Sequence, residues 1–377
     1  GGASKGGGGG PTSGPTCSEL NLRKTLDIKD FMFSGRRGET LVKLPGEVGG
    51  QQFIIERCTD CDIYLLDYSA CVTVDLCSRC RIFIGPCESS VFLRTCEEVR
   101  AVVACQQFRT RDVHRLDVLL LSTSQPTIES TTEVRIGCFS FFYHELAQQL
   151  LKAGLSPFNN RWAEPYNFTP DQGEVILLPP DTPYTALLPP LSSVRPSLLG
   201  GAEECSVPQS CPVPRTLGEH AAAASGLERG FLLVLPAGAP YAVQWLRALC
   251  SARPASPPAV GPPAAAHAAP PPAAAPAVLL RAKEYTKADA AFAARLLASS
   301  AGGKRLLDAA CSGRLIGLHL AAEGCLAALA NRARGWNSGL PQGRGHAPAL
   351  LAAASARECA HLCETFFENS DSGEAMH

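Results

Sequence analysis

Short apolar segments recur along the first half of the chain with a constant spacing of nineteen residues. Each repeat contains two such segments, separated by polar residues and cysteine. The first segment covers residues 53–55, 72–74 and 91–93, and the second covers residues 63–65, 82–84 and 101–103. A fixed period near twenty residues, with two short strands per unit, is typical of a solenoid. The pattern therefore predicts a β-helix with rungs of about 19 residues.

Further apolar segments extend this solenoid in both directions. They predict strands at 40–44, 117–121, 127–128 and 133–136. A short helix is expected over 145–152, followed by an aperiodic strap that carries Trp162, Tyr166 and Phe168. Residues 27–171 are thus predicted to form one β-helical domain closed by this strap.

The second half of the chain alternates predicted strands and helices. Strands are expected at 231–235, 278–280 and 314–320, and helices at 241–250, 287–297 and 323–332. This order argues for a small α/β domain over residues 230–335. Residues 336–377 are predicted to form a C-terminal helix and tail.

Other stretches lack the side chains that a folded core requires. Residues 1–26 are rich in Gly, Pro and Ser, and residues 254–277 are almost entirely Ala and Pro. Neither stretch buries enough apolar surface to offset the entropy lost on ordering. We predict a disordered tail over 1–26, a solvated insert over 254–277, and a linker over 172–229 between the two domains.

The cysteines of the repeat allow two interpretations. Cys58, Cys61, Cys77 and Cys80 have the spacing C-x2-C-x15-C-x2-C, which can signal a tetrahedral zinc site. The third repeat, however, has Val99 where the second cysteine of a third pair would lie, and valine cannot bind metal. Equivalent positions stack about 4.8 Å apart between rungs, and cysteine behaves as a small hydrophobe there. We favour a structural ladder over zinc and expect no metal site.

Composition and charge narrow the function classes. The net charge of −1 gives no bulk attraction to nucleic acid, so no nucleic-acid partner is expected. No apolar stretch predicts a transmembrane helix, and no signal peptide is evident. Without secretion, the seventeen cysteines are expected to be reduced. Gly1 is a candidate for myristoylation, although Lys5 occupies the place where that pattern requires Ser or Thr.

One polar stretch interrupts the apolar solenoid at residues 106–111. Alternation along a strand places Gln107, Arg109 and Arg111 on one face and points Phe108 inward. Such a row is a solvated strand face, or it is a rigid surface that presents an amide and a guanidinium to a partner. Arginine is preferred where a planar cation grips phosphate, and a strand positions it more precisely than a loop does.

At these residues the chain resembles the tubulin cofactor C domain family. The resemblance covers about residues 27 to 171. It is carried by Phe-Ser-Gly at 33–35, Leu-Pro-Gly at 44–46, Gly-Gln-Gln-Phe at 50–53, Gly-Pro at 85–86, Ser-Val-Phe at 90–92, Ala-Cys-Gln-Gln-Phe-Arg at 104–109, Gln-Pro at 125–126, Ile-Glu-Ser at 128–130, Gly-Cys-Phe at 137–139 and Phe-Asn-Asn at 158–160. The resemblance implies a right-handed β-helix, in agreement with the repeat, and it implies no zinc.

The resemblance also implies a function. Members of one branch activate an Arf-like small GTPase by supplying an arginine finger in trans. The finger maps onto Arg109 and its neighbouring glutamine onto Gln107, while partner-binding positions map onto Glu129, Phe168, and, in the same polar stretch, Gln106 and Arg111. The C-terminal half of the family is ferredoxin-like and similar to nucleoside diphosphate kinase. His319 and His346 lack the Asn-x-x-His-Gly context of those kinases, so no kinase activity is expected.

Two other functions stay open at this stage. One is activation of the GTPase of tubulin during tubulin folding, the role of the family's founding branch. The other is a non-catalytic scaffold or effector of an Arf-like GTPase. The chain contains no phosphate-binding loop of the G-x-x-x-x-G-K-[ST] kind, so GTP and magnesium are expected to belong to the partner. The family's setting implies cytoplasm, with peripheral membrane association at the cilium base and traffic of lipidated cargo.

Overall fold

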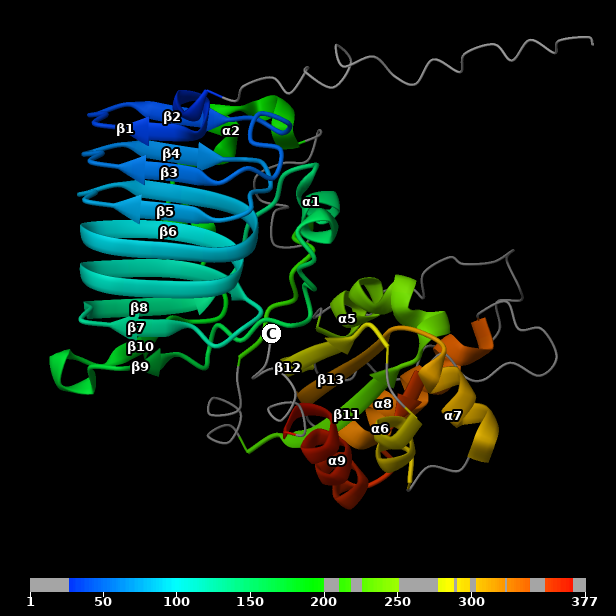
Figure 1. Cartoon of the computed structure of the whole chain (residues 1–377). Helices are drawn as coiled ribbons and strands as arrows, with labels where there is room; N and C mark the ends of the chain where they lie inside the picture. Colours follow the sequence, from blue (N-terminus) through cyan, green and yellow to red (C-terminus); the bar gives the residue numbers. More distant parts are fainter. Residues whose placement is uncertain are drawn as a thin grey trace, which may run out of the picture.

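The computed structural model describes residues 27–199, 210–217, 226–250, 277–287, 290–298, 303–322, 324–339 and 350–368. These form a tall coil of strands and, beside it, a smaller sheet covered by helices (Figure 1). The predicted tail at 1–26, with Gly1, lies outside the described residues, as do residues 254–276 of the Ala/Pro insert and His346. Among the described helices, none combines the length and the apolar character that are needed to cross a bilayer.

The coil is a parallel β-helix, as the repeat predicts. Its strands are β1 (Met32–Ser34), β2 (Thr40–Lys43), β3 (Phe53–Glu56), β4 (Asp62–Leu65), β5 (Val72–Asp75), the long β6 (Arg81–Ser122), β7 (Thr127–Glu129) and β8 (Thr132–Cys138). Phe53 pairs with Val72, and Val72 pairs with Val91, so successive rungs are offset by nineteen residues. A one-turn helix, η1 (Ile28–Phe31), precedes the first strand. The predicted solenoid and its period are confirmed.

The C-x2-C motifs form the corners of the coil. The residues just before the first cysteines, Arg57 and Leu76, have left-handed backbone with φ of 51° and 55°, so the chain turns sharply there. The cysteines themselves point inward and are buried. Each first cysteine lies near a backbone carbonyl of the rung above, with Sγ–O distances of 3.7 Å from Cys58 to Phe33, 3.8 Å from Cys77 to Ile55 and 3.7 Å from Cys96 to Val74. The repeated contact is that of a structural ladder.

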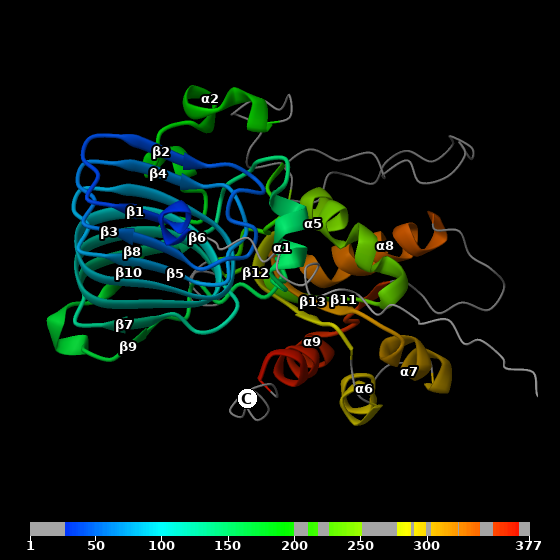
Figure 2. The same cartoon turned by 45° about the horizontal axis from the view of Figure 1, so that its top comes forward.

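A second apolar layer covers the outside of the coil. Helix α1 (Leu146–Lys152) lies at the edge of the coil that faces the other domain (Figures 1 and 2). Phe83 from the coil stacks on Phe141, with ring centroids 4.0 Å apart, and Tyr184 packs edge-on against Phe141 at 4.5 Å. Tyr184 belongs to the segment 172–229, predicted as a linker. Much of that segment therefore packs on the coil, because its aromatic and leucine side chains complete this layer.

The strap and the segment that follows it contribute short elements. They are β9 (Tyr166–Asn167), η2 (Pro170–Gln172), β10 (Val175–Leu177), η3 (Tyr184–Ala186), α2 (Leu191–Val194) and η4 (Pro196–Leu199). Strand β9 pairs with β7, and β10 pairs with β8, both in parallel. The predicted strap thus adds β9 to the end of the coil, and the predicted linker adds β10. Trp162 of the strap is buried.

The second domain is a four-stranded antiparallel sheet. Its elements are β11 (Glu228–Val234), η6 (Pro236–Tyr241), α5 (Ala242–Cys250), β12 (Val278–Tyr285), α6 (Ala290–Leu296), α7 (Gly303–Cys311), β13 (Leu315–Ala322), α8 (Cys325–Gly339), β14 (Leu350–Ala352), α9 (Ala356–Cys363) and η7 (Glu364–Glu368). The strand order β12-β13-β11-β14 is that of a ferredoxin-like sheet, which agrees with the prediction. The expected boundary at residue 335 falls inside α8, and β14 and α9 beyond it belong to the same domain.

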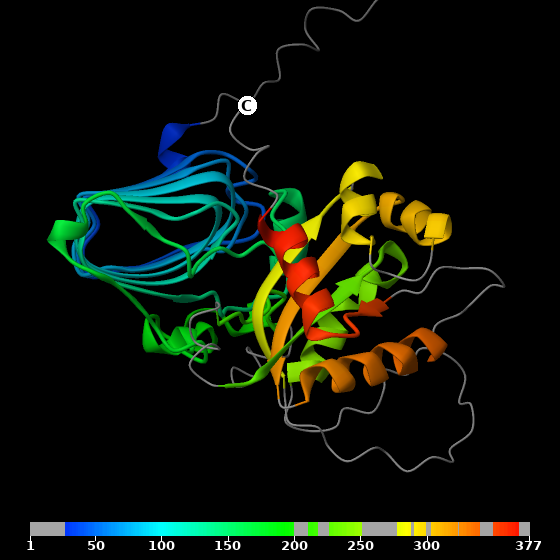
Figure 3. The same cartoon turned by 90° about the horizontal axis from the view of Figure 1, so that it is seen from below.

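Helices cover both faces of this sheet. Helices α5 and α8 pack on one face, and α6, α7 and α9 pack on the other (Figure 3). The two domains meet through the segment that follows α1. Ser156 donates a hydrogen bond of 2.5 Å to the buried carboxylate of Glu284, and the Asn159 side chain bonds both backbone groups of Glu284. The contact is specific because a buried carboxylate requires hydrogen-bond partners.

Candidate functional site

The polar stretch of the sequence lies on the outer face of β6. Phe108 and Thr110 are buried in the coil, so Arg109 and Arg111 between and beyond them point outward to solvent. Gln107 is half-exposed on the same side. The alternation predicted from the sequence is therefore confirmed. A strand of a parallel β-helix is bonded on both sides, so this row of side chains has a rigid base.

Three strands build the face around Arg109. In the register of the sheet, Arg109 lies beside Thr127 of β7, and Thr127 lies beside Tyr166 of β9. Two residues further along the same strands, Arg111 lies beside Glu129. Phe168 continues this row, because its backbone N–H donates to the carbonyl of Ile128 at 2.8 Å. Residues that are almost sixty positions apart in the sequence thus share one surface.

The face combines charge with exposed aromatic rings. Tyr166 and Phe168 are 50% and 60% exposed, and their rings meet edge to face with centroids 4.7 Å apart. Exposed aromatic side chains of this size are common at the centre of protein interfaces. The rings lie next to Glu129, so the surface has an apolar part and an acidic part.

Arg109 differs from the other arginines of this face in its surroundings. Its guanidinium lies over the ring of Phe92, 5.8 Å from the centroid, and it forms no ion pair with any residue that the structure describes. Arg111, by contrast, has carboxylates of Asp112 and Glu129 at 3.7 and 3.8 Å. Arg109 is thus an exposed cation on a rigid strand with its donors available to an anion.

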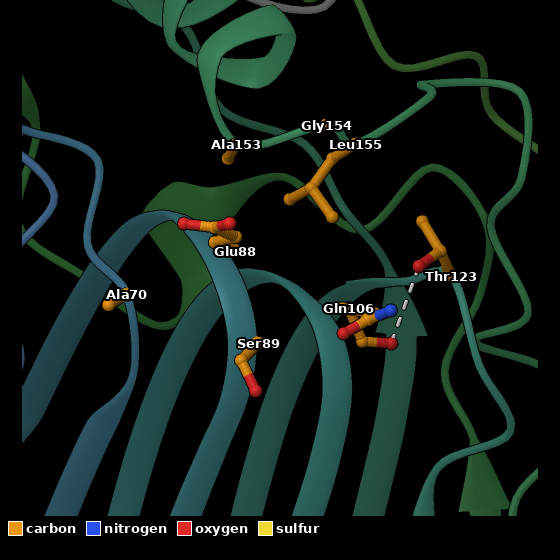
Figure 4. A pocket seen from close by; sticks show the side chains of 8 residues that line it. All are labelled: Ala70, Glu88, Ser89, Gln106, Thr123, Ala153, Gly154 and Leu155. Carbon is orange, nitrogen blue, oxygen red and sulfur yellow. Dashed lines mark hydrogen bonds between the residues drawn. The ribbon is translucent and has the colours of Figure 1, made fainter. Parts of the chain in front are cut away.

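Gln106 does not share this face. The strand bends at this corner, and the Gln106 side chain lines a pocket of about 520 Å³ between the coil and the end of α1 (Figure 4). Glu88, Thr123 and Leu155 line the same pocket. The Gln106 carbonyl accepts a hydrogen bond of 2.8 Å from Ser124. The structure thus brings Gln107, Arg109, Arg111, Glu129 and Phe168 together and places Gln106 to one side of them.

A separate group of potential metal ligands lies in the α/β domain. His319 of β13 and Cys359 and Cys363 of α9 place one ligand atom each within 4.8 Å of one another, and all three are buried. It is the only such group among the residues described by the structure. The sequence analysis assigned no ligand role here; the only sequence signal is the spacing of four between the two cysteines, which puts both on one side of a helix.

Comparison with known proteins finds a family model that matches most of the coil. Residues 50–168 match the family model described as tubulin binding cofactor C. The match includes β3 to β8 and the strap as far as Phe168, so it contains the whole face around Arg109. It confirms the resemblance on which the expected site residues rest.

Several of the relatives found are proteins named Protein XRP2. The one from Xenopus laevis is 50% identical over 177 residues, which are 46% of this chain and 50% of the relative. The one from Homo sapiens is 42% identical over 169 residues, which are 44% of this chain and 48% of the relative. A more distant relative, tubulin-specific chaperone C from Homo sapiens, is 24% identical over 136 residues, which are 36% of this chain and 39% of that protein. The chain matches about half the length of the XRP2 relatives.

Proposed function

We propose that the protein, whose residues 50–168 match the tubulin binding cofactor C family model, is a GTPase activator that supplies Arg109 to an Arf-like small GTPase. The observation that carries the proposal is the state of Arg109. It is an exposed guanidinium on a rigid strand, and no carboxylate of the described chain neutralises it. Such a group has its full charge and its fork of donors available to a phosphate.

The chemistry of phosphoryl transfer explains how one arginine suffices. In the loose transition state, negative charge accumulates on the transferred phosphoryl group and on the leaving oxygen. A guanidinium that is already fixed in place stabilises this charge without the cost of reorganising water. Arginine fingers accelerate hydrolysis by about 10³- to 10⁵-fold, or roughly 4–7 kcal/mol. The partner GTPase supplies the nucleotide and magnesium, because this chain contains no phosphate-binding loop.

The residues near Arg109 have separate roles in the proposed complex with the GTPase. Gln107, two residues before it on the same strand face, is placed to orient the finger or the attacking water. Glu129 and Arg111 form a charged column that sets the orientation of the partner. Phe168 provides the apolar contact that holds the complex together. Gln106, which lines the corner pocket, lies at the edge of the proposed interface.

Single-turnover hydrolysis by a GTP-loaded Arf-like GTPase tests the proposal. The unmodified chain is expected to accelerate hydrolysis by orders of magnitude, and Arg109→Ala is expected to lose about 10³-fold or more of this acceleration. Binding of Arg109→Ala is measured separately, with the GTPase held in its GTP form by a non-hydrolysable analogue. Arg94→Ala is the matched control, since Arg94 is also exposed on β6 but is paired with Asp75 at 2.8 Å.

Two results would contradict the proposal. Tight binding without acceleration by the unmodified chain would make it an effector or scaffold of the GTPase. Equal losses in Arg109→Ala and Arg94→Ala would remove the special role of Arg109. The distant similarity to tubulin-specific chaperone C favours tubulin as the second candidate substrate, so GTP-loaded tubulin is assayed in parallel. Acceleration with tubulin alone would assign the chain to that role.

A further inference from the structure

The three buried ligand atoms of the α/β domain carry an inference that is independent of the GTPase face. We propose that His319, Cys359 and Cys363 form a zinc site that ties helix α9 to the central strand β13. The three side chains come from two elements separated by about forty residues, and they are 2%, 3% and 9% exposed. An imidazole and two thiols that converge in this way are a donor set that zinc accepts.

The geometry fits a tetrahedral ion with little adjustment. The three ligand atoms lie within 4.8 Å of one another. With zinc–sulfur bonds of about 2.3 Å, two sulfurs of a tetrahedron are about 3.8 Å apart. Small side-chain rotations therefore close the site. Cys359 and Cys363 follow each other by one helical turn of α9, so both thiols lie on the same side of that helix.

The donor set and the charge balance select zinc. One imidazole nitrogen and two thiolates are borderline to soft donors, which zinc accepts and calcium or magnesium do not. The positive charges of Arg229 and Arg281 act on His319 and would repel a bare dication. An ion with two thiolates is neutral as a unit, however, so it can be buried beside them without a net-charge penalty. Cys363 is the least buried ligand, and a solvent molecule on its side completes the tetrahedron.

The site adds a cross-link where the packing already positions the helix. Phe366, one turn after α9, is fully buried beneath Gly317 of β13. A side chain at Gly317 would approach the Phe366 ring to 2.5 Å, so the close approach of α9 to the strand depends on this glycine. With the helix held there by Phe366, His319 faces the two cysteines from the neighbouring strand position. Zinc then fixes the C-terminal helix to the sheet.

Metal analysis of the full-length protein, purified with zinc in the medium, tests the inference. One zinc ion per chain is expected, and the double variant Cys359→Ser/Cys363→Ser is expected to lose it. Two controls retain the zinc: Cys311→Ser, which removes a thiol elsewhere in the domain, and Cys58→Ser/Cys61→Ser, which removes the first corner of the coil. Loss of zinc in the coil variant, or its retention in the Cys359→Ser/Cys363→Ser variant, would overturn the assignment.

A second measurement keeps the test decisive if the double variant does not fold. The metal-free chain carrying Cys58→Ser/Cys61→Ser is titrated with cobalt, and the absorption of tetrahedral thiolate coordination is expected at one equivalent. His319→Gln should change the ligand-field bands while the thiolate charge transfer remains. Chelation of zinc from the unmodified chain should lower its melting temperature by roughly 4 °C or more. A flat cobalt titration, together with a melting temperature that chelator does not change, would refute the site.

Discussion

Some arginines on the outer surface of the coil pair with a carboxylate, and others, Arg109 among them, form no ion pair with a residue that the structure describes. In the upper rungs, several arginines are bonded to an aspartate one rung above, as Arg81 is to Asp62 at 2.5 Å and Arg94 to Asp75 at 2.8 Å. Arg135 repeats the arrangement below, with Asp117 as its partner. Arg109 lies between these levels on the same continuous strand as Arg81 and Arg94. Its vertical neighbours are Phe92 and Thr127, neither of which is charged.

This comparison separates the exposure of a guanidinium from the availability of its donors. The paired arginines are about half exposed, yet their donors are occupied, and each exposed pair contributes only about 0–1 kcal/mol to stability. Arg109 lies on an equally rigid strand but has no carboxylate partner among the described residues. Its charge is therefore available for an anion that arrives with another protein. The substitutions below either remove this difference or test its consequence.

The largest effect is expected from a change that keeps the charge of Arg109 and removes its shape. Arg109→Lys retains a cation but loses the planar fork that matches phosphate oxygens. We expect at least about 100-fold of the acceleration of GTP hydrolysis to be lost, since most of the finger's effect depends on that fork. Arg94→Lys, in the paired region, should leave hydrolysis unchanged. Single-turnover rates of GTP hydrolysis with both variants test this prediction. Equal rates for Arg109→Lys and the unmodified chain would contradict it.

A smaller effect, on binding rather than on chemistry, is expected at Phe168. Its ring is mostly exposed and contacts only Tyr166 among the aromatic residues of the face. Phe168→Ala should weaken the complex with the GTP-form GTPase by about 10-fold, or roughly 1.4 kcal/mol, because the variant no longer places an aromatic ring in a pocket of the partner. The melting temperature should not change. Ile176→Ala is the control, since Ile176 is 58% exposed but lies on β10 beside β8.

Two outcomes of the binding measurement separate the alternatives. If Phe168→Ala binds as tightly as Ile176→Ala, the aromatic pair is not part of the interface. If Phe168→Ala lowers both affinity and melting temperature, its ring stabilises the strap and the affinity loss is indirect. Titration calorimetry and thermal melting on the same preparations provide both readouts.

The sequence predicts those features of the molecule that depend on local repetition. The nineteen-residue period places Phe53, Val72 and Val91 in successive rungs because each rung packs only on its neighbours. It also favours a structural ladder over zinc for the cysteines, since the third copy replaces one by Val99. The inward orientation of Phe108, and with it the exposure of Arg109, follows from strict alternation along a straight strand.

Features that depend on packing between distant parts of the chain could not be predicted from the sequence. Gln106 leaves the face because the strand bends at a corner, where alternation no longer applies. The segment around Tyr184 has no period, so nothing in its sequence shows that it covers Phe141. Strand β14 has three residues, too few for a pattern to be recognised. The approach of Cys359 to His319 depends on the docking of α9, which the spacing of residues along the chain does not reveal.

The smallest effect is expected from giving Arg109 the partner that the other arginines have. Thr127→Asp places a carboxylate beside Arg109 in the register of β7, as Asp75 lies beside Arg94. An exposed pair is worth about 0.2–1 kcal/mol, so hydrolysis should slow by only about 1.5- to 5-fold. Thr127→Asn has the same shape without the charge and should leave the rate unchanged. Raising the ionic strength should return the Thr127→Asp rate toward that of Thr127→Asn, because salt screens exposed charges. Equal rates for the two variants at low salt would show that Arg109 is set apart by its geometry and not by its lack of a carboxylate.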